Sequence, residues 1–419
     1  MTQSSASFRS FSLCIVPLSA SLRRHGRYND PQTCTSLRPA LGENAARRYG
    51  GGMRHIIVYR DRLFAKSEVA FLRRQYAGFT RLAPLWSGRR LEPGPLPEGF
   101  TLGPQLGGLG GLAFKLAGRV PDLAAFQALK PLCIHAQFGR GGALALPLAE
   151  ALGVPLIVTF HGSEVDKQSH YRTWPVPSLF RLRLARLQAR GAAFICISEN
   201  ARQRLLARGF PAAKTHALPI GTDVISPAPR EYPGEGIVFA GRFAEMKGIP
   251  ILLDAIRILR AEGFSAPCTL IGDGPLRPAI ARAAAGIAGL TMPGWLGQAD
   301  LRAAMAGARV LCVPSIILPG GESEGLPSVA VEAMGLGVPV VASDEARTEG
   351  LVCDGETGLI VPARQPRALA TALGALLSSP GQAAQMGAAA QAHVRRNFCA
   401  ATQSRALEAL LLDICGVRP

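Results

Sequence analysis

The sequence predicts an α/β protein made of two doubly wound domains with parallel sheets. Three observations lead to this prediction. The chain has 419 residues, which suits two domains of ordinary size. Short runs rich in Val and Ile alternate with amphipathic stretches along most of it. These runs are short and apolar on both faces, as strands buried inside a parallel sheet should be.

Eight strands are predicted, four in each half. The first half holds 55–59, 132–138, 154–160 and 193–198, and the second holds 236–241, 268–272, 309–314 and 338–342. Helices are expected between them, at 68–79, 142–152, 178–190, 199–208, 247–262, 275–285, 327–336 and 366–378. Residues 93–111 are rich in Pro and Gly and predict a loop, and 400–415 predict a final helix that packs back across the first half. Parallel strands end at one edge of their sheet, so ligand sites are expected in the cleft between the two halves.

The first 52 residues differ from the rest. No acidic residue occurs before position 30, and 11–22 (FSLCIVPLSASL) resembles a short signal segment that Pro17 interrupts. The first strand begins two residues after Met53, which favours a start at that methionine. We therefore expect 1–52 to be a disordered or spurious leader. The expected domains are 53–220 and 221–399, and 400–419 form the C-terminal helix.

Charge is distributed unevenly along the chain. The net charge is +17, of which residues 53–220 carry +14 (23 basic, 9 acidic) and residues 221–419 carry −2 (16 basic, 18 acidic). A polyanionic partner is expected on the basic half. Nucleic acid is disfavoured, because aromatic residues are only 6% of the chain and none lies among the arginines to stack on bases. The nine cysteines and seven histidines are scattered, which favours a reducing compartment and no metal site.

Two stretches of the second half predict a site for an anionic ligand. In 239–248 (FAGRFAEMKG) a strand ends and Arg242 and Lys247 flank a turn before a helix, where amide N–H groups and cations together attract a phosphate. In 320–337 (GGESEGLPSVAVEAMGLG) Glu324 precedes a turn and Glu332 follows within the next helix. Two carboxylates so placed can bind hydroxyl groups on separate parts of one ligand. Pro327 is expected at the first helical position.

The first half contributes a histidine. In 154–166 (VPLIVTFHGSEVD) His161 and Gly162 follow a buried strand at the end that faces the cleft. A second turn, 135–142 (HAQFGRGG), also ends a strand, and its glycines permit close approach of a ligand to the backbone.

Together these segments resemble the retaining family 4 (group 1) glycosyltransferases of GT-B fold, which have two Rossmann-like domains. The resemblance covers about 53–415. It rests on GRFAEMKG and ESEGLPSVAVEAMGLGVPVVAS, and on LPIGTDV, IGDGPL, ISENARQRLL and FHGSEV in matching order. HAQFG and the Ser67–Glu68 loop resemble a bacterial branch that makes exopolysaccharide or lipopolysaccharide.

The resemblance implies a role for each matching residue. Arg242 and Lys247 would hold the diphosphate of a nucleotide-sugar donor, and Glu332 its ribose. Glu324 would contact hydroxyls of the transferred sugar, and backbone groups of Gly325, Leu326 and Pro327 would cradle sugar and phosphate. His161 would lie at the reaction centre. No metal and no cofactor is implied beyond the donor, which is a substrate.

The sequence also departs from the family pattern. Residues 60–69 lack the Gly-Gly loop of many members, and 316–323 lack an acidic pair. In 344–352 (DEARTEGLV), Ala346 and Arg347 occupy expected glycine positions and Gly350 an expected Glu position. A two-domain sugar-binding protein without catalysis and a GT-B-like sugar-nucleotide epimerase remain as alternatives.

The basic half is expected to meet the acceptor. A glycan or lipid-linked acceptor at an anionic membrane surface would account for its charge, with the protein cytoplasmic or peripheral on the inner face of the cytoplasmic membrane. The arginines expected to face the lipid are Arg73, Arg74, Arg89, Arg90, Arg183, Arg186 and Arg190.

Overall fold

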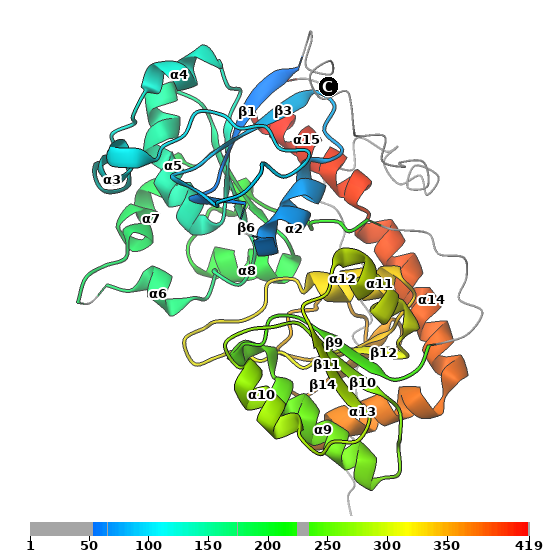
Figure 1. Cartoon of the computed structure of the whole chain (residues 1–419). Helices are drawn as coiled ribbons and strands as arrows, with labels where there is room; N and C mark the ends of the chain where they lie inside the picture. The colour runs from blue at the N-terminus through cyan, green and yellow to red at the C-terminus, as the bar shows by residue number, and fades with distance from the viewer. Residues whose placement is uncertain (1–52, 65, 174, 224–233, 418–419) are drawn as a thin grey trace, which may run out of the picture.

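The computed structural model describes residues 53–64, 66–173, 175–223 and 234–417. These residues form two six-stranded sheets in which every strand pair is parallel (Figure 1). The predicted leader, 1–52, lies outside the described residues. Each half of the α/β chain therefore contains one parallel sheet, as predicted.

The first sheet has the order β3-β1-β5-β6-β7-β8. Its strands are β1 (Arg54–Tyr59), β3 (Leu82–Ser87), β5 (Ile134–Gln137), β6 (Leu156–Phe160), β7 (Ala193–Cys196) and β8 (Thr215–Ala217). The strands β2 (Arg62–Leu63) and β4 (Arg90–Leu91) form a separate parallel pair. The helices are α2 (Lys66–Tyr76), α3 (Gly108–Ala117), α4 (Leu123–Ala128), α5 (Gly139–Leu152), α6 (Gln168–Tyr171), α7 (Leu179–Arg190) and α8 (Glu199–Ala207).

The second sheet has the order β11-β10-β9-β12-β13-β14. Its strands are β9 (Ile237–Ala240), β10 (Cys268–Ile271), β11 (Leu290–Gly294), β12 (Val310–Val313), β13 (Val340–Ser343) and β14 (Gly358–Val361). Its helices are α9 (Ile249–Ala261), α10 (Arg277–Ala284), α11 (Gln298–Gly307), α12 (Ser328–Gly335), α13 (Pro366–Ser378) and α14 (Pro380–Asn397), and α15 (Ala400–Ile414) ends the chain's described part. Short 3-10 helices cover Ala212–Lys214 and Glu245–Lys247.

All eight predicted strands are present. Strands such as β1 and β9 are apolar at successive positions because alternate residues enter the core on opposite faces of the sheet. In β1, Ile57 and Tyr59 enter the core on one face of the sheet, whereas Ile56 and Val58 enter the core on the other. In β9, Ile237 and Phe239 are separated from Val238 and Ala240 in the same way. Both faces of these two strands are thus covered by apolar side chains.

The predicted loop 93–111 is wrong at its end, because α3 begins at Gly108. The N-cap residue is Gly107, which has no side chain to cap the helix. Glycines also occur within the helix, so its first turn looks like a loop in the sequence. Similarly, Ser67 and Glu68 lie in the first turn of α2 and not in a loop.

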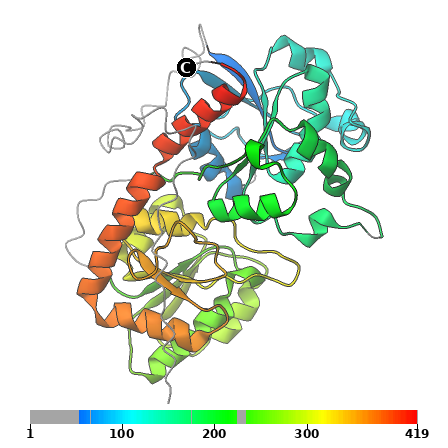
Figure 2. The same cartoon turned by 180° about the vertical axis from the view of Figure 1, so that it is seen from behind.

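The chain crosses between the halves twice, at neighbouring places. Thr222 N donates to the Phe398 carbonyl at 2.8 Å, and Ala400 N donates to the Thr222 carbonyl at 2.9 Å. Between these crossings α14 packs on α12 of the second half, and α15 then packs on α2 of the first. In Figures 1 and 2 the two helices run along one side of the molecule from the second half to the first. The prediction that the last helix returns to the first half is confirmed.

Candidate active site

The loops after β6 and β12 meet between the two sheets. A Cβ added to Gly162 would lie 2.8 Å from Gly325 Cα, and one added to Gly325 would collide with the carbonyl oxygen of His161. Only glycine at both positions allows this approach. The contact brings His161, from the first half, next to the segment that follows Glu324 in the second.

The same two loops touch along their length. Gln168 N donates to the Gly320 carbonyl at 3.0 Å, and Lys167 Nζ lies 2.7 Å from a Glu322 carboxylate oxygen. The two halves are therefore in contact along these two loops.

Lys247 and Glu324 form an ion pair with each other. Lys247 ends a short 3-10 helix, and Gly248 follows with φ +64° as the N-cap of α9. A Cβ at Gly248 would collide with the carbonyl oxygen of Pro314, so the Lys-Gly pair of the motif fits here for a steric reason. Glu324 is 7% exposed and also accepts a hydrogen bond from Ser315 Oγ at 2.9 Å. The two groups expected to bind opposite parts of a donor neutralise each other in this state.

Arg242 is arranged differently from Lys247. It lies in the turn after β9 with an exposed side chain, and no side-chain partner for it exists among the residues described. Its backbone carbonyl accepts from Ala244 N at 2.9 Å, which keeps the turn tight. The guanidinium is thus available to a ligand, although the structure does not bring it to the Lys247–Glu324 pair.

Gly325, Leu326 and Pro327 lead from Glu324 into α12. Pro327 is the N-cap and not the first helical residue, because its ψ of 103° is extended. Within the described part of the chain, the N–H groups of Gly325 and Leu326 have no protein acceptor. Two such amides directly before a helix can receive an anionic oxygen.

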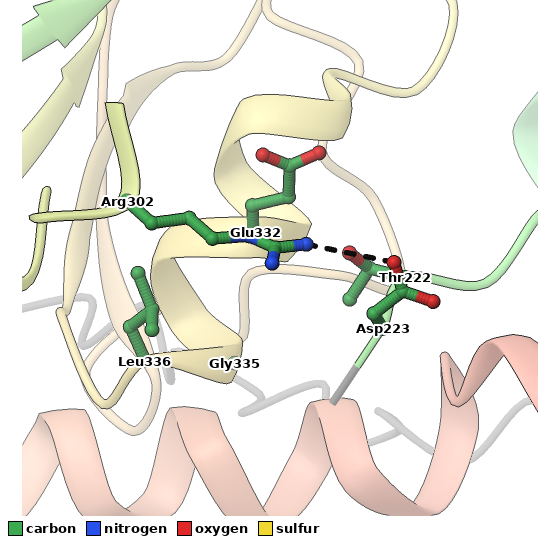
Figure 3. A pocket seen from close by; sticks show the side chains of 6 residues that line it. All are labelled: Thr222, Asp223, Arg302, Glu332, Gly335 and Leu336. Carbon is green, nitrogen blue, oxygen red and sulfur yellow. Dashed lines mark hydrogen bonds and ion pairs between the residues drawn. The ribbon is translucent and has the colours of Figure 1, made fainter. Parts of the chain in front are cut away.

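Glu332 lies in a small pocket at the junction of the two halves, which Figure 3 shows. Arg74 of α2 donates to Glu332 Oε1 at 2.8 Å and to Asp223 at 3.2 Å, and Arg302 lies 3.5 Å from the same Asp223 carboxylate. Gln298 donates to the other Glu332 oxygen at 3.2 Å. Both carboxylate oxygens that were expected to bind ribose are therefore occupied by protein groups.

The pocket beside Glu332 has a volume of about 10 Å³ and is lined by Thr222, Asp223, Arg302, Glu332, Gly335 and Leu336. This is space for about one water molecule. A ribose could enter only after the Arg74 contact opens. Arg74 was predicted to face lipid, and that prediction is wrong, because the side chain is buried between the halves.

His161 is buried in an aromatic and polar surrounding. The Phe138 ring lies 4.1 Å from the imidazole, centroid to centroid, and the Arg60 guanidinium lies over the Phe138 ring, 4.0 Å from its centroid. Phe138 has φ +65°, an unusual backbone conformation for an aromatic residue. The following Gly139 is needed because a Cβ there would collide with Phe160.

A chain of buried hydrogen bonds fixes the His161 ring. Its Nε2 is 2.8 Å from Gln137 Oε1, and Gln137 Nε2 donates to Tyr76 Oη at 2.5 Å. Tyr76 Oη is 2.7 Å from His135 Nδ1, and His135 Nε2 is 2.7 Å from Thr159 Oγ1. With the Gln137 amide so oriented, His161 carries its proton on Nε2 and presents Nδ1 as an acceptor.

Burial lowers the pKa of His161 to about 3, with further lowering by Arg60 and His135, and burial lowers the pKa of His135 to about 3 as well. Both rings are therefore neutral near pH 7. A neutral His161 can accept or donate a hydrogen bond, but it supplies no positive charge to the site.

Sequence reasoning missed several residues of this site. Gln137 stands in the HAQFG segment without an assigned role, and Tyr76 and Arg74 reach the site from α2. No local pattern marks these residues, because each contributes through a contact with a distant part of the chain. In the described ranges, no group of three or more His, Cys, Asp or Glu side chains is arranged to hold a metal ion.

Two family models match the chain. Residues 51–221 match a glycosyl transferase 4-like domain, and residues 234–379 match the glycosyl transferases group 1. A relative from Mycolicibacterium smegmatis, a GDP-mannose-dependent alpha-(1-6)-phosphatidylinositol monomannoside mannosyltransferase, is 31% identical over 293 residues, which cover 65% of this chain and 75% of that protein. The amylovoran biosynthesis glycosyltransferase AmsK of Erwinia amylovora is 27% identical, with 62% of this chain and 65% of AmsK covered. The chain spans 59–65% of the length of the first curated relatives that it matches.

Solved structures with the same fold include Anabaena Alr3699/HepE in complex with UDP-glucose, with a TM-score of 0.66, 19% identity, and coverage of 86% of this chain and 100% of that one. The lipopolysaccharide outer core galactosyltransferase WaaB has a TM-score of 0.64, 15% identity, and coverage of 86% and 99%. The predicted GT-B architecture is confirmed.

Proposed function

We propose that this chain, which belongs to the group 1 glycosyltransferases, transfers a sugar from a nucleotide-sugar donor to a glycan or lipid-linked acceptor in cell-surface polysaccharide or glycolipid biosynthesis. One observation carries the proposal. The Gly162–Gly325 contact brings His161 of one half next to the segment after Glu324 of the other, and Glu324 is held by Lys247. Groups suited to a diphosphate and to a sugar thus lie together in one cleft.

The chemistry follows from charge. When a glycosyl bond to a diphosphate breaks, negative charge grows on the leaving group and the sugar takes on oxocarbenium character. Lys247 and Arg242 would stabilise the leaving diphosphate, helped by the N–H groups of Gly325 and Leu326 before Pro327. We further propose that no metal ion takes part, since the two cations can do its electrostatic work.

The sugar would lie between Glu324 and His161. Glu324 would accept hydrogen bonds from sugar hydroxyls once Lys247 turns to the diphosphate, and neutral His161 would accept one through Nδ1. Glu332 would accept from the ribose hydroxyls after Arg74 withdraws. Retention of configuration at the anomeric carbon is proposed from family membership.

A donor screen tests the proposal. Purified protein is incubated with UDP-, GDP- and ADP-sugars and lipid-linked acceptors, and products are examined by mass spectrometry and NMR. We expect one donor to be consumed with retained anomeric configuration and with full activity in EDTA. Inversion would contradict retention alone, loss in EDTA would contradict metal independence, and binding without turnover would favour a non-catalytic sugar-binding protein.

The proposed acceptor side is an anionic membrane surface. Leu112 and Leu116 of α3 are 61% and 64% exposed, and Leu182 of α7 is 64% exposed. Arg183 Nη2 donates to the Lys115 carbonyl at 3.0 Å, which ties α7 to the end of α3, and the two helices lie on the same side of the first half in Figure 1. Arg181 and Arg190 are exposed on α7, and Arg119 is exposed two residues after the end of α3. This combination of apolar and basic side chains suits anionic lipid.

Several arginines predicted to face lipid have other partners. Arg89 pairs with Asp61 at 2.6 Å, Arg186 donates to Glu150 at 2.8 Å, and Arg183 donates to backbone carbonyls. In the described part of the chain, no helix is both long and apolar enough to cross a bilayer.

A further inference from the structure

Arg347 stands in the loop after β13 with a backbone that favours glycine. Its φ is +59°, and the family resemblance expects glycine at this position. Strained residues of this kind concentrate at functional sites. Arg364 has the same φ of +59° but bonds Glu345 and the Ile317 carbonyl, away from Asp166. Arg347 is directed toward Asp166 across the cleft.

Three arginines share the single carboxylate of Asp166. Arg204 forms an ion pair with it, Arg208 lies 3.7 Å away, and Arg347 lies 3.6 Å away from the other half of the molecule. The side chains of Arg204 and Arg347 are only 14% and 16% exposed, so water screens them poorly. Glu349, which accepts from Asn200 Nδ2 at 3.1 Å, and Glu345 also act electrostatically on Arg347. The three arginines outnumber the one carboxylate that they contact, and these two glutamates offset part of their charge.

Hydrogen-bond donors in this cluster lack acceptors. Arg204 Nη2, Arg347 Nε and Tyr171 Oη are buried without a partner in the described structure. Tyr171 belongs to the cluster because its ring lies 4.4 Å beneath the Arg208 guanidinium. Buried polar atoms are almost always satisfied in folded proteins, so such a group of donors requires an explanation. A second anionic group would supply the missing acceptors.

The cluster adjoins the proposed sugar position. Arg204 Nη1 is 3.4 Å from the Gly162 carbonyl, and Arg204 Nη2 lies 3.6 Å from where a Gly162 Cβ would be. Gly162 follows His161 and touches Gly325, which follows Glu324. The unpaired Arg204 donor is therefore next to the two residues between which the transferred sugar would lie.

We propose that Arg204 and Arg347 form a binding site for a carboxylate on the transferred sugar, so that the donor is a nucleotide-activated hexuronic acid. Guanidinium groups bind carboxylates in a planar, two-bonded geometry, and Asp166 shows that a carboxylate fits among them. This inference rests on the proposed function, because it presumes a nucleotide-sugar donor.

Matched donors test the inference by binding alone. Calorimetric titration compares UDP-glucose with UDP-glucuronate, UDP-galactose with UDP-galacturonate, and GDP-mannose with GDP-mannuronate, each pair differing only at C6. In the pair that binds, the wild-type chain should prefer the acid by about 10–100-fold, the range expected for a charge-assisted Arg–carboxylate contact. R347G, which also relieves the φ strain, should remove most of that preference and leave the affinity for the free nucleotide unchanged. R364G is the control and should keep the preference.

The two proposals fail differently. If none of the nucleotides or sugars binds, the proposed function is wrong. If they bind and the neutral sugar is preferred, or R347G weakens both members of a pair equally, the donor proposal stands and the carboxylate site is wrong. Equal weakening would mean that Arg347 only holds the two halves together through Asp166. If R347G weakened the binding of phosphorylated acceptors and left the donor affinities unchanged, the proposed carboxylate site would also be wrong.

Discussion

Lys247 and Arg242 carry the same expected role but occupy different surroundings. Lys247 is paired with buried Glu324, whereas Arg242 is exposed. We expect Arg242→Ala to lower kcat by a factor of about 10²–10³, as removal of one preorganised donor to a developing anion does. Because the side chain is exposed, its removal should leave the melting temperature unchanged. Activity near that of the wild type would remove Arg242 from the site.

Lys247→Ala should lower kcat similarly and also destabilise the fold. Its removal leaves the carboxylate of Glu324, 7% exposed, without a cation, and an unpaired buried charge is costly. Thermal unfolding with and without UDP or GDP separates the two effects. The double variant Lys247→Ala with Glu324→Gln serves as the control, and we expect it to recover stability but not activity. A stable, active single variant would contradict both assignments.

The buried histidines predict a pH dependence of stability. The pKa values of His161 and His135 are lowered to about 3 by burial, below the usual value of about 6.5 in an unfolded chain. The unfolded state therefore binds more protons between pH 6.5 and pH 3. The stabilisation that comes from keeping these histidines neutral should be fully present above pH 6.5. Below pH 6.5 the free energy of unfolding should fall by up to about 1.4 kcal/mol per pH unit for each histidine.

Urea titrations at pH 7 and pH 5 measure this effect. Other groups titrate in the same range, so the informative comparison is between the wild type and His161→Gln. The variant should show a shallower fall in unfolding free energy with decreasing pH. An identical slope would mean that His161 is not buried as a neutral ring.

The role of a residue could be predicted from the sequence where it depends on neighbours along the chain, and not where it depends on a distant contact. Gly248 and Lys247 belong to a motif whose backbone geometry is local, and that turn could be read from the sequence. Arg74 was counted as a surface charge, but it is bonded to Glu332, 258 positions later in the chain. Charge counts report which cations a chain contains and say nothing of which carboxylates have already engaged them.

Apart from the short β2–β4 pair, the strands that sequence reasoning missed share one position in the fold. β3, β8, β11 and β14 are the four edge strands of the two sheets, whereas all eight predicted strands lie in the interior. Interior strands are covered on both faces and read as continuous apolar runs. Edge strands need no such covering and tolerate proline, as Pro84 in β3 and Pro293 in β11 illustrate. The periodic signal is therefore strongest where the sheet is most buried.

The α15 helix is joined to β3 by one buried carboxylate. Glu408 Oε1 accepts from the N–H groups of Thr80, Arg81 and Leu82 at 2.8, 2.7 and 2.8 Å. Glu408→Ala should lower the free energy of unfolding by about 2–3 kcal/mol, because hydrogen bonds to a charged acceptor are lost and amides stay unpaired. Guanidinium chloride titration measures the loss. Asp413→Asn, on the exposed face of the same helix, is the control, and an equal effect in both would show that the β3 contact is unimportant.

At the scale of the whole molecule, Arg74 links the two halves at the position where ribose would bind. If ribose binds Glu332 as proposed, the Arg74–Glu332 contact has to open first, because the adjoining pocket holds about one water molecule. Arg74→Gln should therefore tighten nucleotide binding by up to about tenfold, the equivalent of about 1.4 kcal/mol. Arg73→Ala, exposed on the same helix, should leave affinity unchanged. Weaker binding in Arg74→Gln would mean that the arginine itself contacts the nucleotide.

The basic half of the chain also exposes two leucines of α3. Leu112 and Leu116 are one turn apart, so both lie on the same face of the helix. Burying one leucine side chain in an apolar phase contributes about 1.5–3 kcal/mol. Replacing both by serine should then reduce partitioning of the protein to phosphatidylglycerol vesicles at least tenfold.

The contribution of charge is separable from that of the leucines. Vesicles of phosphatidylcholine alone should bind the wild type weakly, and raising the salt concentration should weaken binding to anionic vesicles, because exposed charges are screened over about 10 Å at 0.1 M salt. Leu91→Ser, a 50% exposed leucine in β4, is the control and should bind as the wild type does. Equal sedimentation with neutral and anionic vesicles would contradict the role of the basic half. Undiminished binding of the double serine variant would move the contact away from α3. Membrane contact by this surface would explain why the half proposed to receive the acceptor, and not the half proposed to bind the donor, carries the excess of positive charge.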